Sequence, residues 1–280
     1  PGGAAPTCGT GIHFTGLPKL LELVLTNGED KRTGIQVFAP HNHKLDTFED
    51  VWDVWMMYMR ELLDVANKIN NIQMDVWINM PVVASMLKPD CFKKGQHIGN
   101  EGARYNGGIN FESCGTVNFI NSMASLKKNV YDDKKYTLEE MTDAILHNFG
   151  FKTAFETGVY SPDRREATDE APKYEKIFFD CVNAPKYGNA DPYADSILKD
   201  YEDRMLPEML RLRSYYGKQY YMCQISVSTH GPQGAITLAT PDGRLAGTTY
   251  ADGSMSPAPT TDKNGIYAVF ESATCYDHAM

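Results

Sequence analysis

The feature that most constrains the fold is a long run of helical periodicity in the first third of the chain. From Phe48 onward, apolar residues recur at intervals of three and four, which places them on one face of an α-helix. Thr47 followed by Asp50 resembles a capping box, and Asn70-Asn71 is expected to end the helix. The apolar stripe comprises Val51, Trp52, Trp55, Met56, Met59, Leu62, Leu63, Ala66 and Ile69. We expect this stripe to pack into a core rather than to form a ligand surface.

Helical patterns predominate along the rest of the chain, and strand-like segments are isolated. Similar spacing predicts helices over 18–25, 81–87, 117–130, 138–146 and 191–205, the last ended or kinked by Pro207. Residues typical of strands predict extended segments over 220–229 and 266–273. The glycine-rich segments 1–14 and 99–108 are expected to be loops. Helices with strands between them favour an α/β fold, either layered or barrel-shaped.

Composition and charge exclude several classes of partner. The formal net charge of −9 argues against binding to nucleic acid or to an anionic membrane surface. No stretch approaches the ~18 consecutive apolar residues of a membrane-spanning helix. The segment 161–176 is polar, contains two prolines and lacks apolar periodicity, so we expect it to be a surface insertion.

No metal site is expected in this chain. The six cysteines show no closely spaced pair of the kind that binds zinc, and they are expected to be reduced thiols in a cytoplasm. His41 and His43 have no third ligand nearby, which favours a solvated loop over a metal site.

The segment 222–233, MCQISVSTHGPQ, has the most informative polar pattern. In an extended strand Gln224, Ser226 and Ser228 would share one face, and the residues between them would share the other. The polar row could line a substrate-filled cavity or face water on an edge strand, and the pattern alone leaves both open. Neither serine lies in a G-x-S-x-G elbow, so the pattern gives little support to a serine nucleophile. The segment 102–108 lacks the glycine and lysine spacing of phosphate-binding loops.

Several segments together resemble the glycyl radical enzymes, the family of pyruvate formate-lyase. They are APKYGNADPYAD at 184–195, ATPDGRLAGTTYADGSMSP at 239–257, DKNGIYAVFESAT at 262–274, GARYN at 102–106 and NSMASLKKNVYDD at 121–133. The resemblance implies part of an α/β barrel, in which two parallel half-sheets are surrounded by helices. It also implies that 1–280 is an internal fragment of one barrel domain. The family's catalytic cysteine loop would precede this fragment, and its C-terminal glycyl radical domain would follow.

Within this family, the segments 139–151 and 228–254 look most like the fumarate-adding branch, typified by benzylsuccinate synthase and its alkylsuccinate relatives. In that branch a radical on a backbone glycine passes to a cysteine, and the thiyl radical takes hydrogen from a hydrocarbon. The carbon radical then adds to fumarate. We therefore expect a catalytic-subunit fragment of a carbon–carbon lyase or synthase that acts on fumarate and a toluene-like compound or an alkane.

Two alternatives to fumarate addition remain open. The branch holds fumarate with an arginine in the opening loop, but 1–14 contains none and the first arginine is Arg32. This absence favours another glycyl radical lyase, an arylacetate decarboxylase or a dehydratase-type eliminase. An alternative of another class is a non-catalytic scaffold or binding subunit.

The resemblance places the thiyl cysteine and the radical glycine outside 1–280, so no catalytic residue is expected in this chain. Substrate contacts are expected from Gln224, Ser226 and Ser228, because their segment matches the family's substrate-lining strand. Thr10 and His13 are the polar side chains expected to contact substrate from the opening loop. No cofactor is expected to bind the fragment, although the full-length enzyme would carry the glycyl radical. The implied partners are a radical S-adenosylmethionine activating enzyme and small accessory subunits, in the cytoplasm of an anaerobic bacterium.

Overall fold

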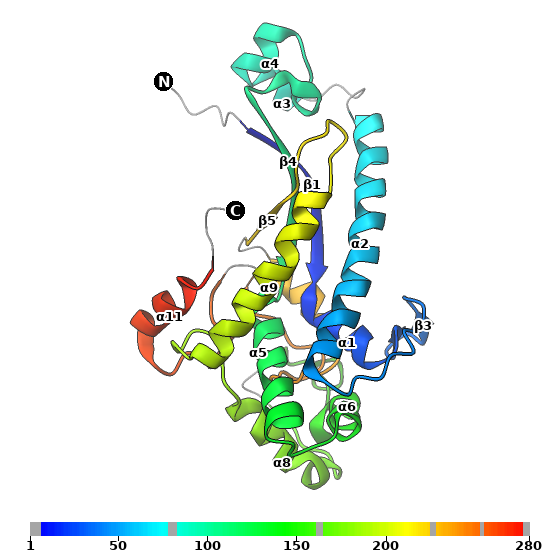
Figure 1. The fold of residues 1–280 in the computed structure, drawn as a ribbon, viewed down its shortest axis with the longest axis vertical. Coiled ribbons are helices and arrows are strands. Elements are labelled where there is room, and N and C mark those ends of the chain that lie inside the picture. The colour runs from blue at the N-terminus through cyan, green and yellow to red at the C-terminus, as the bar shows by residue number, and fades with distance from the viewer. Residues whose placement is uncertain (1–6, 78–82, 161–164, 225–227, 253–254, 277–280) are drawn as a thin grey trace.

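A parallel sheet of three strands forms the centre of the chain, and its order is β1-β4-β5. The computed structural model describes residues 7–77, 83–160, 165–224, 228–252 and 255–276. The strands of the sheet are β1 (Thr7–Gly16), β4 (Tyr105–Cys114) and β5 (Tyr221–Cys223). Both neighbours run parallel to the central strand β4, with Phe14 of β1 and Cys223 of β5 paired to Glu112. A short antiparallel pair, β2 (Glu29–Asp30) and β3 (Ile35–Gln36), lies apart from this sheet (Figure 1).

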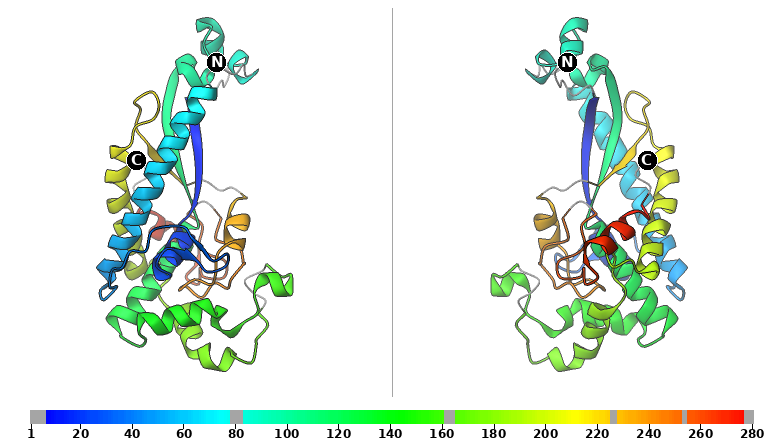
Figure 2. Two further views of the ribbon diagram at one scale, coloured as in Figure 1. Left: turned by 90° about the vertical axis from the view of Figure 1, so that its right-hand side faces the viewer. Right: turned by 90° about the vertical axis from the view of Figure 1, so that its left-hand side faces the viewer.

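Helices follow the strands and cover the sheet. The longer ones are α1 (Leu17–Leu25), α2 (Phe48–Trp77), α5 (Thr116–Leu126), α6 (Leu138–Leu146), α8 (Ala171–Asn183), α9 (Pro192–Arg211) and α11 (Gly265–Ala273). The shorter ones are α3 (Val83–Met86), α4 (Pro89–Lys94), α7 (Ala154–Thr157), α10 (His230–Ala235), the π-helical turns η1 (Ile98–Gly102) and η2 (Lys127–Asp132), and the 3₁₀ turn η3 (Asn148–Gly150). Helices α2 and α9 lie on one side of the sheet, and α10 lies on the other (Figure 2). Parallel strands with covering helices confirm the predicted α/β class.

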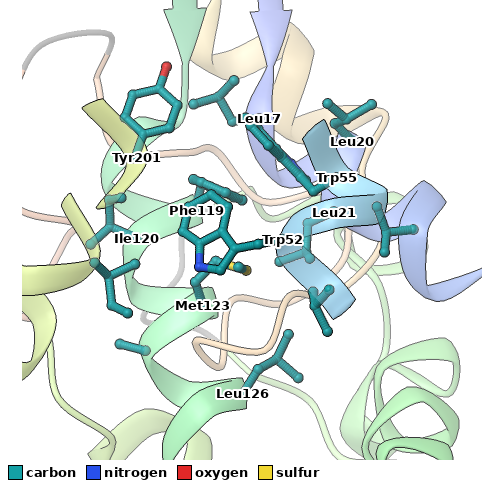
Figure 3. Close-up of a cluster of buried hydrophobic side chains, with 14 of the residues drawn as sticks. Leu17, Leu20, Leu21, Trp52, Trp55, Phe119, Ile120, Met123, Leu126 and Tyr201 are labelled. Carbon is teal, nitrogen blue, oxygen red and sulfur yellow. The ribbon is translucent and has the colours of Figure 1, made fainter. Parts of the chain in front are cut away.

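The largest buried cluster lies where α1, α2, α5 and α9 meet (Figure 3). Trp55 stacks on Phe119 with ring centroids 4.6 Å apart, and Trp52 meets both rings edge-on. Tyr201 of α9 packs against Phe119 at 5.8 Å. Close-packed aromatic rings of this kind contribute through buried area and through their ring geometry. The helical stripe that begins at Phe48 therefore packs into the core, as predicted.

Helix α2 runs well past its predicted end at Asn70-Asn71. Asn70 is buried, and its Nδ2 donates a hydrogen bond of 3.2 Å to the hydroxyl of Tyr220. The same hydroxyl donates to Asn67 Oδ1 at 2.7 Å. A partner distant in sequence thus satisfies amide side chains that would otherwise favour a turn. The predicted end was wrong because this contact is invisible in the local sequence.

Other predicted boundaries also need correction. The predicted strand 266–273 is the helix α11, whose buried residues Ala268 and Ser272 are four apart, as on one helix face. Its aromatic and β-branched residues, which suggested a strand, are largely exposed. The predicted loops 1–14 and 99–108 instead contain most of β1 and the start of β4.

The later part of the chain shows three smaller differences. Helix α9 continues beyond Pro207 to Arg211, with Met205 and Met209 buried on either side of the proline. Within the predicted strand 220–229, the described strand is β5, and 225–227 lie outside the described residues. The predicted surface insertion 161–176 includes the start of α8, where Tyr174 is buried.

Gly115 joins β4 to α5 and gives a test of this packing. Its φ of +71° is a left-handed conformation, and an added Cβ would lie 2.7 Å from Cδ2 of Tyr250. We expect Gly115→Ala to lower the free energy of unfolding by roughly 2–4 kcal/mol, from backbone strain and overpacking together. Gly231→Ala is the matched control, because a Cβ there meets nothing within 4 Å. Urea denaturation followed by tryptophan fluorescence measures both, and equal effects would contradict the described junction.

Candidate functional site

The two faces of β4 have different surroundings. Phe111 belongs to the buried hydrophobic cluster, on the side of the sheet that α2 and α9 cover. Because successive side chains of a strand point to opposite faces, Asn110, Glu112 and Cys114 face the other way. Cys114 Sγ lies 3.2 Å from Oγ1 of Thr229, the residue that precedes α10. The second face of the sheet therefore presents a row of polar groups toward the α10 side.

Glu112 is the most unusual group on this face. Its side chain is buried, with a relative exposure of 4%, and Oε2 has no hydrogen-bond partner among the described residues. Burial raises the pKa of the Glu112 carboxyl above its ordinary value of 4.5. Oδ1 of Asn110, two positions earlier, likewise has no partner within the described part of the chain. Buried polar atoms are nearly always paired in folded proteins, so these two oxygens on one strand face are candidates for contact with a ligand or with side chains outside the described set.

Two thiols flank this carboxyl. Cys223 pairs with Glu112 in the register of β4 and β5, and Cys114 follows two positions along β4. Burial raises the pKa of both thiols, and the nearby Glu112 raises each of them further. A thiol with a raised pKa stays protonated at neutral pH. The face therefore offers neutral hydrogen-bonding groups and not ionic nucleophiles.

Gln224, a predicted substrate contact, bridges two structural elements. Its Nε2 donates to Ser113 Oγ at 2.8 Å, and its Oε1 accepts from Thr116 Oγ1 at 3.1 Å. These bonds tie the end of β5 to the start of α5. Ser113 and Glu112 are successive residues of β4, so their side chains point to opposite faces. The amide of Gln224, which bonds Ser113, therefore lies on the side of the sheet that α2 and α9 cover. Contact between Gln224 and substrate stays a prediction.

The structure describes the backbone of three of the other four predicted contacts. Ser228 is exposed and just precedes the start of α10, whereas Ser226 lies outside the described residues. Thr10 and His13 belong to β1, paired in register with Ile109 and Phe111 of β4, and their side chains lie outside the described set.

The sequence analysis did not predict Glu112 and Asn110 as site residues. The segment 109–114 alternates apolar or small residues with polar ones, but the neighbouring glycines led to a loop being predicted up to 108. Recognising a strand there would have placed Asn110 and Glu112 on one face.

The described residues contain no group of three or more His, Cys, Asp or Glu side chains that could hold a metal ion. His41 Nε2 instead lies 3.1 Å from the carbonyl of Val24, and its Nδ1 accepts from the backbone N–H of His43. Cys91, Cys114, Cys181, Cys223 and Cys275 are free thiols. Among the described helices, none combines the length and the apolar character that crossing a membrane requires.

A parallel sheet covered by helices, with buried polar groups on one face, is the organisation of an α/β fold. The fold matches a solved structure from work on 1,2-propanediol dehydration in Roseburia inulinivorans, with a TM-score of 0.82 and 26% identity over 98% of this chain and 33% of that one. The family described as pyruvate formate lyase-like matches residues 5–234. The chain belongs to this family, which confirms the resemblance at the family level.

Two curated relatives are named as decarboxylases. The 4-hydroxyphenylacetate decarboxylase glycyl radical subunit of Clostridium scatologenes is 68% identical over 100% of this chain and 31% of its own length. The indoleacetate decarboxylase of Tractidigestivibacter scatoligenes is 37% identical over 92% of this chain and 30% of its own length. The chain thus spans about a third of the length of these relatives.

The expectation of fumarate addition was wrong, because these relatives are decarboxylases of arylacetates. The segments that suggested it, 139–151 and 228–254, include stretches that build the family's fold: 139–146 lie in α6, and Leu245 and Tyr250 are buried. The missing arginine in 1–14 was the more informative signal.

The raised pKa of Glu112 predicts a pH-dependent stability difference. Folding favours the protonated carboxyl, so its stabilising effect is complete below pH 4.5 and is lost as pH rises through the folded-state pKa. The side chain introduced by Glu112→Gln cannot titrate. As pH rises through this window, the free energy of unfolding of the variant should therefore increase relative to that of the wild type, by up to about 1.4 kcal/mol per pH unit.

Urea denaturation of both proteins between about pH 4 and pH 8 measures this difference. Glu139→Gln, at an exposed position on α6, is the matched control and should show no such growth. A stability difference between Glu112→Gln and the wild type that stays constant across the range would contradict a buried, protonated Glu112.

Proposed function

We propose that this chain forms part of the glycyl radical subunit of an arylacetate decarboxylase. The identities of 68% and 37% to two arylacetate decarboxylases support this substrate class. The structural observation that carries the proposal is the buried carboxyl of Glu112, with one oxygen unpaired among the described residues. In the reaction an arylacetate loses its carboxylate as CO₂, and the methylene carbon gains one proton in its place. The product is a methylated arene.

Glu112 suits one end of such a substrate. The names of the two relatives denote substrates that carry a donor on the aromatic ring system, a hydroxyl in one and an indole N–H in the other. The buried carboxyl accepts a hydrogen bond from such a donor through its unpaired oxygen. The O–H of a protonated carboxyl could also donate to the acetate carboxylate, but the ring donor is the feature that both named substrates add to the arylacetate group. We therefore assign to Glu112 the binding and orientation of the ring, with Asn110 as its neighbour on the strand.

The remaining parts of the proposal concern the full-length subunit. The glycyl radical there supplies hydrogen-atom transfer through a cysteine, and both groups lie outside this chain in the proposed arrangement. A radical S-adenosylmethionine activating enzyme is the proposed partner, in the cytoplasm of an anaerobic bacterium. Thr10 and His13 on β1, and Gln224, Ser226 and Ser228 in the sequence that follows β5, stay proposed substrate contacts. The protonated thiols of Cys114 and Cys223 keep the face neutral.

Activity of the full-length subunit, activated anaerobically by its activating enzyme, tests the assignment of Glu112. The wild type should convert 4-hydroxyphenylacetate to 4-methylphenol and CO₂. Glu112→Ala should lower kcat/KM for this substrate by about 10–100-fold, because it leaves the ring hydroxyl unpaired. Glu112→Gln keeps a hydrogen-bond acceptor, so its kcat/KM should fall less than that of Glu112→Ala. With phenylacetate, which lacks the hydroxyl, neither variant should differ from the wild type by more than about threefold.

The yield of glycyl radical, measured by electron paramagnetic resonance, is the control for each variant, and Glu139→Gln controls for substitution at the surface. Formation of a succinate adduct from added fumarate, with no CO₂ released, would overturn the decarboxylase proposal. If Glu112→Ala lowers kcat/KM equally for both substrates at unchanged radical yield, the role of Glu112 at the ring hydroxyl is overturned. The decarboxylase proposal itself is not affected by that result.

A further inference from the structure

A polar cavity of about 650 Å³ lies away from the sheet. Its walls come from α5, η2, α8, the turn between α8 and α9, the turn at 242–245 and the loop 258–264, and no residue of the described sheet lines it. Asn189 ties two of these walls together, since its Oδ1 accepts from the backbone N–H of Lys263 at 2.8 Å and its Nδ2 donates to the carbonyl of Thr261. The cavity is therefore a built feature of the fold, with a size in the range of ligand pockets.

Cations outnumber acids in the wall of this cavity. Its charged residues are Lys128, Arg165, Lys186, Asp191, Asp242, Arg244 and Lys263. Lys128 pairs outside this set, with Asp133 at 2.9 Å. For Arg165, Lys186, Arg244 and Lys263, no carboxylate lies within 4 Å among the described residues. The cavity lining therefore carries more positive than negative charge, with Asp191 and Asp242 as its two carboxylates.

Lys186 is buried in this wall, with a relative exposure of 7%. Its ammonium donates to the carbonyls of Cys181 at 2.7 Å and of Ala184 at 3.1 Å, which uses two of its three N–H groups. Burial lowers the pKa of Lys186 to about 8, and the negative charge of Asp242 opposes this shift. An ammonium in this position gains stability from any anion that reaches its remaining N–H group.

Arg244 is buried beside the same carboxylate, with a relative exposure of 6%. Its guanidinium donates to backbone carbonyls, including those of Leu238 and Thr248, while Nε has no partner among the described residues. Asp242 is itself held by Asn118 Nδ2 at 2.8 Å and by the hydroxyl of Thr240. Asp242 acts on both buried cations, and Glu22, which also pairs with Lys19, acts on Arg244. Because buried charge is normally paired at close range, an anion in contact with Lys186 or Arg244 would stabilise the site.

We propose that this cavity binds an anionic group, a carboxylate or a phosphate, through Lys186 and Arg244. Two sources share this chemistry. One is a free small anion or an anionic metabolite that enters from solution. The other is an acidic side chain from the part of the subunit that this chain lacks, since the chain spans 31% of the length of the Clostridium scatologenes relative. Neither source involves Glu112, so this inference stands apart from the proposed decarboxylation.

A structure of the full-length subunit, determined with and without added inorganic phosphate, tests the proposal directly. We expect an anionic oxygen within about 4 Å of Lys186 Nζ or Arg244 Nε. A phosphate at this position assigns the site to a free anion, and an Asp or Glu carboxylate assigns it to the rest of the subunit. A cavity that holds water or apolar side chains alone, under both conditions, overturns the proposal.

Titration of the full-length subunit with inorganic phosphate, followed by its melting temperature at constant ionic strength, separates the two sources in solution. A free-anion site should raise the melting temperature in a saturable way. Lys186→Met should weaken the apparent affinity by at least about tenfold, because it removes one close charge partner. Lys186→Arg keeps the charge and should bind.

Lys199→Met, at an exposed position on α9, is the matched control and should bind like the wild type. If phosphate does not raise the melting temperature of the wild type, the structure of the full-length subunit decides. A carboxylate at Lys186 or Arg244 supports the internal source, and the absence of one overturns the proposal. Equal phosphate responses of the wild type and Lys186→Met would also overturn it, because the anion would then bind elsewhere.

Discussion

The burial of Phe111 against the helices is the constraint on which the site depends. Once Phe111 is buried in the hydrophobic core, the alternation of a strand places Asn110 and Glu112 on the opposite face. A slip of one residue in the register of β4 would reverse both faces, so the cluster of Trp52, Trp55 and Phe119 also determines where the polar groups lie. The core therefore positions the site without contacting it.

The electrostatics of this site follow from the same burial. Withdrawal from water raises the pKa of the Glu112 carboxyl and of the two flanking thiols. Such a surface can bind and orient a neutral ring donor while it offers no ionised nucleophile. This property fits a reaction in which hydrogen atoms move between carbon and sulfur and competing ionic reactions are excluded. The cavity at Lys186 and Arg244 shows the opposite character, with positive charge held in place by backbone carbonyls.

Much of the fold could be predicted from local sequence, and the failures have identifiable physical causes. The stripe of α2 and the capping box of Thr47 and Asp50 depend on neighbours in the chain, so spacing alone predicted them correctly. The extension of α2 depends on Tyr220, which no local pattern includes. The strand β1 contains several glycines and threonines and is extended because it pairs with β4, so its own residues suggested a loop. The site residue Glu112 was missed for the same reason, since its strand was not recognised in full.

The branch of the family could not be read from motifs that build the shared fold. Arylacetate decarboxylation is the function that the sequence identities and the geometry of Glu112 support together. Its central claim is a hydrogen bond between Glu112 and the ring donor of the substrate. A structure of the full-length subunit with 4-hydroxyphenylacetate bound measures this contact most directly. The account predicts the ring oxygen within about 3 Å of a Glu112 carboxyl oxygen. A ring hydroxyl that points away, with Glu112 bonded instead to another side chain of the subunit, would contradict it.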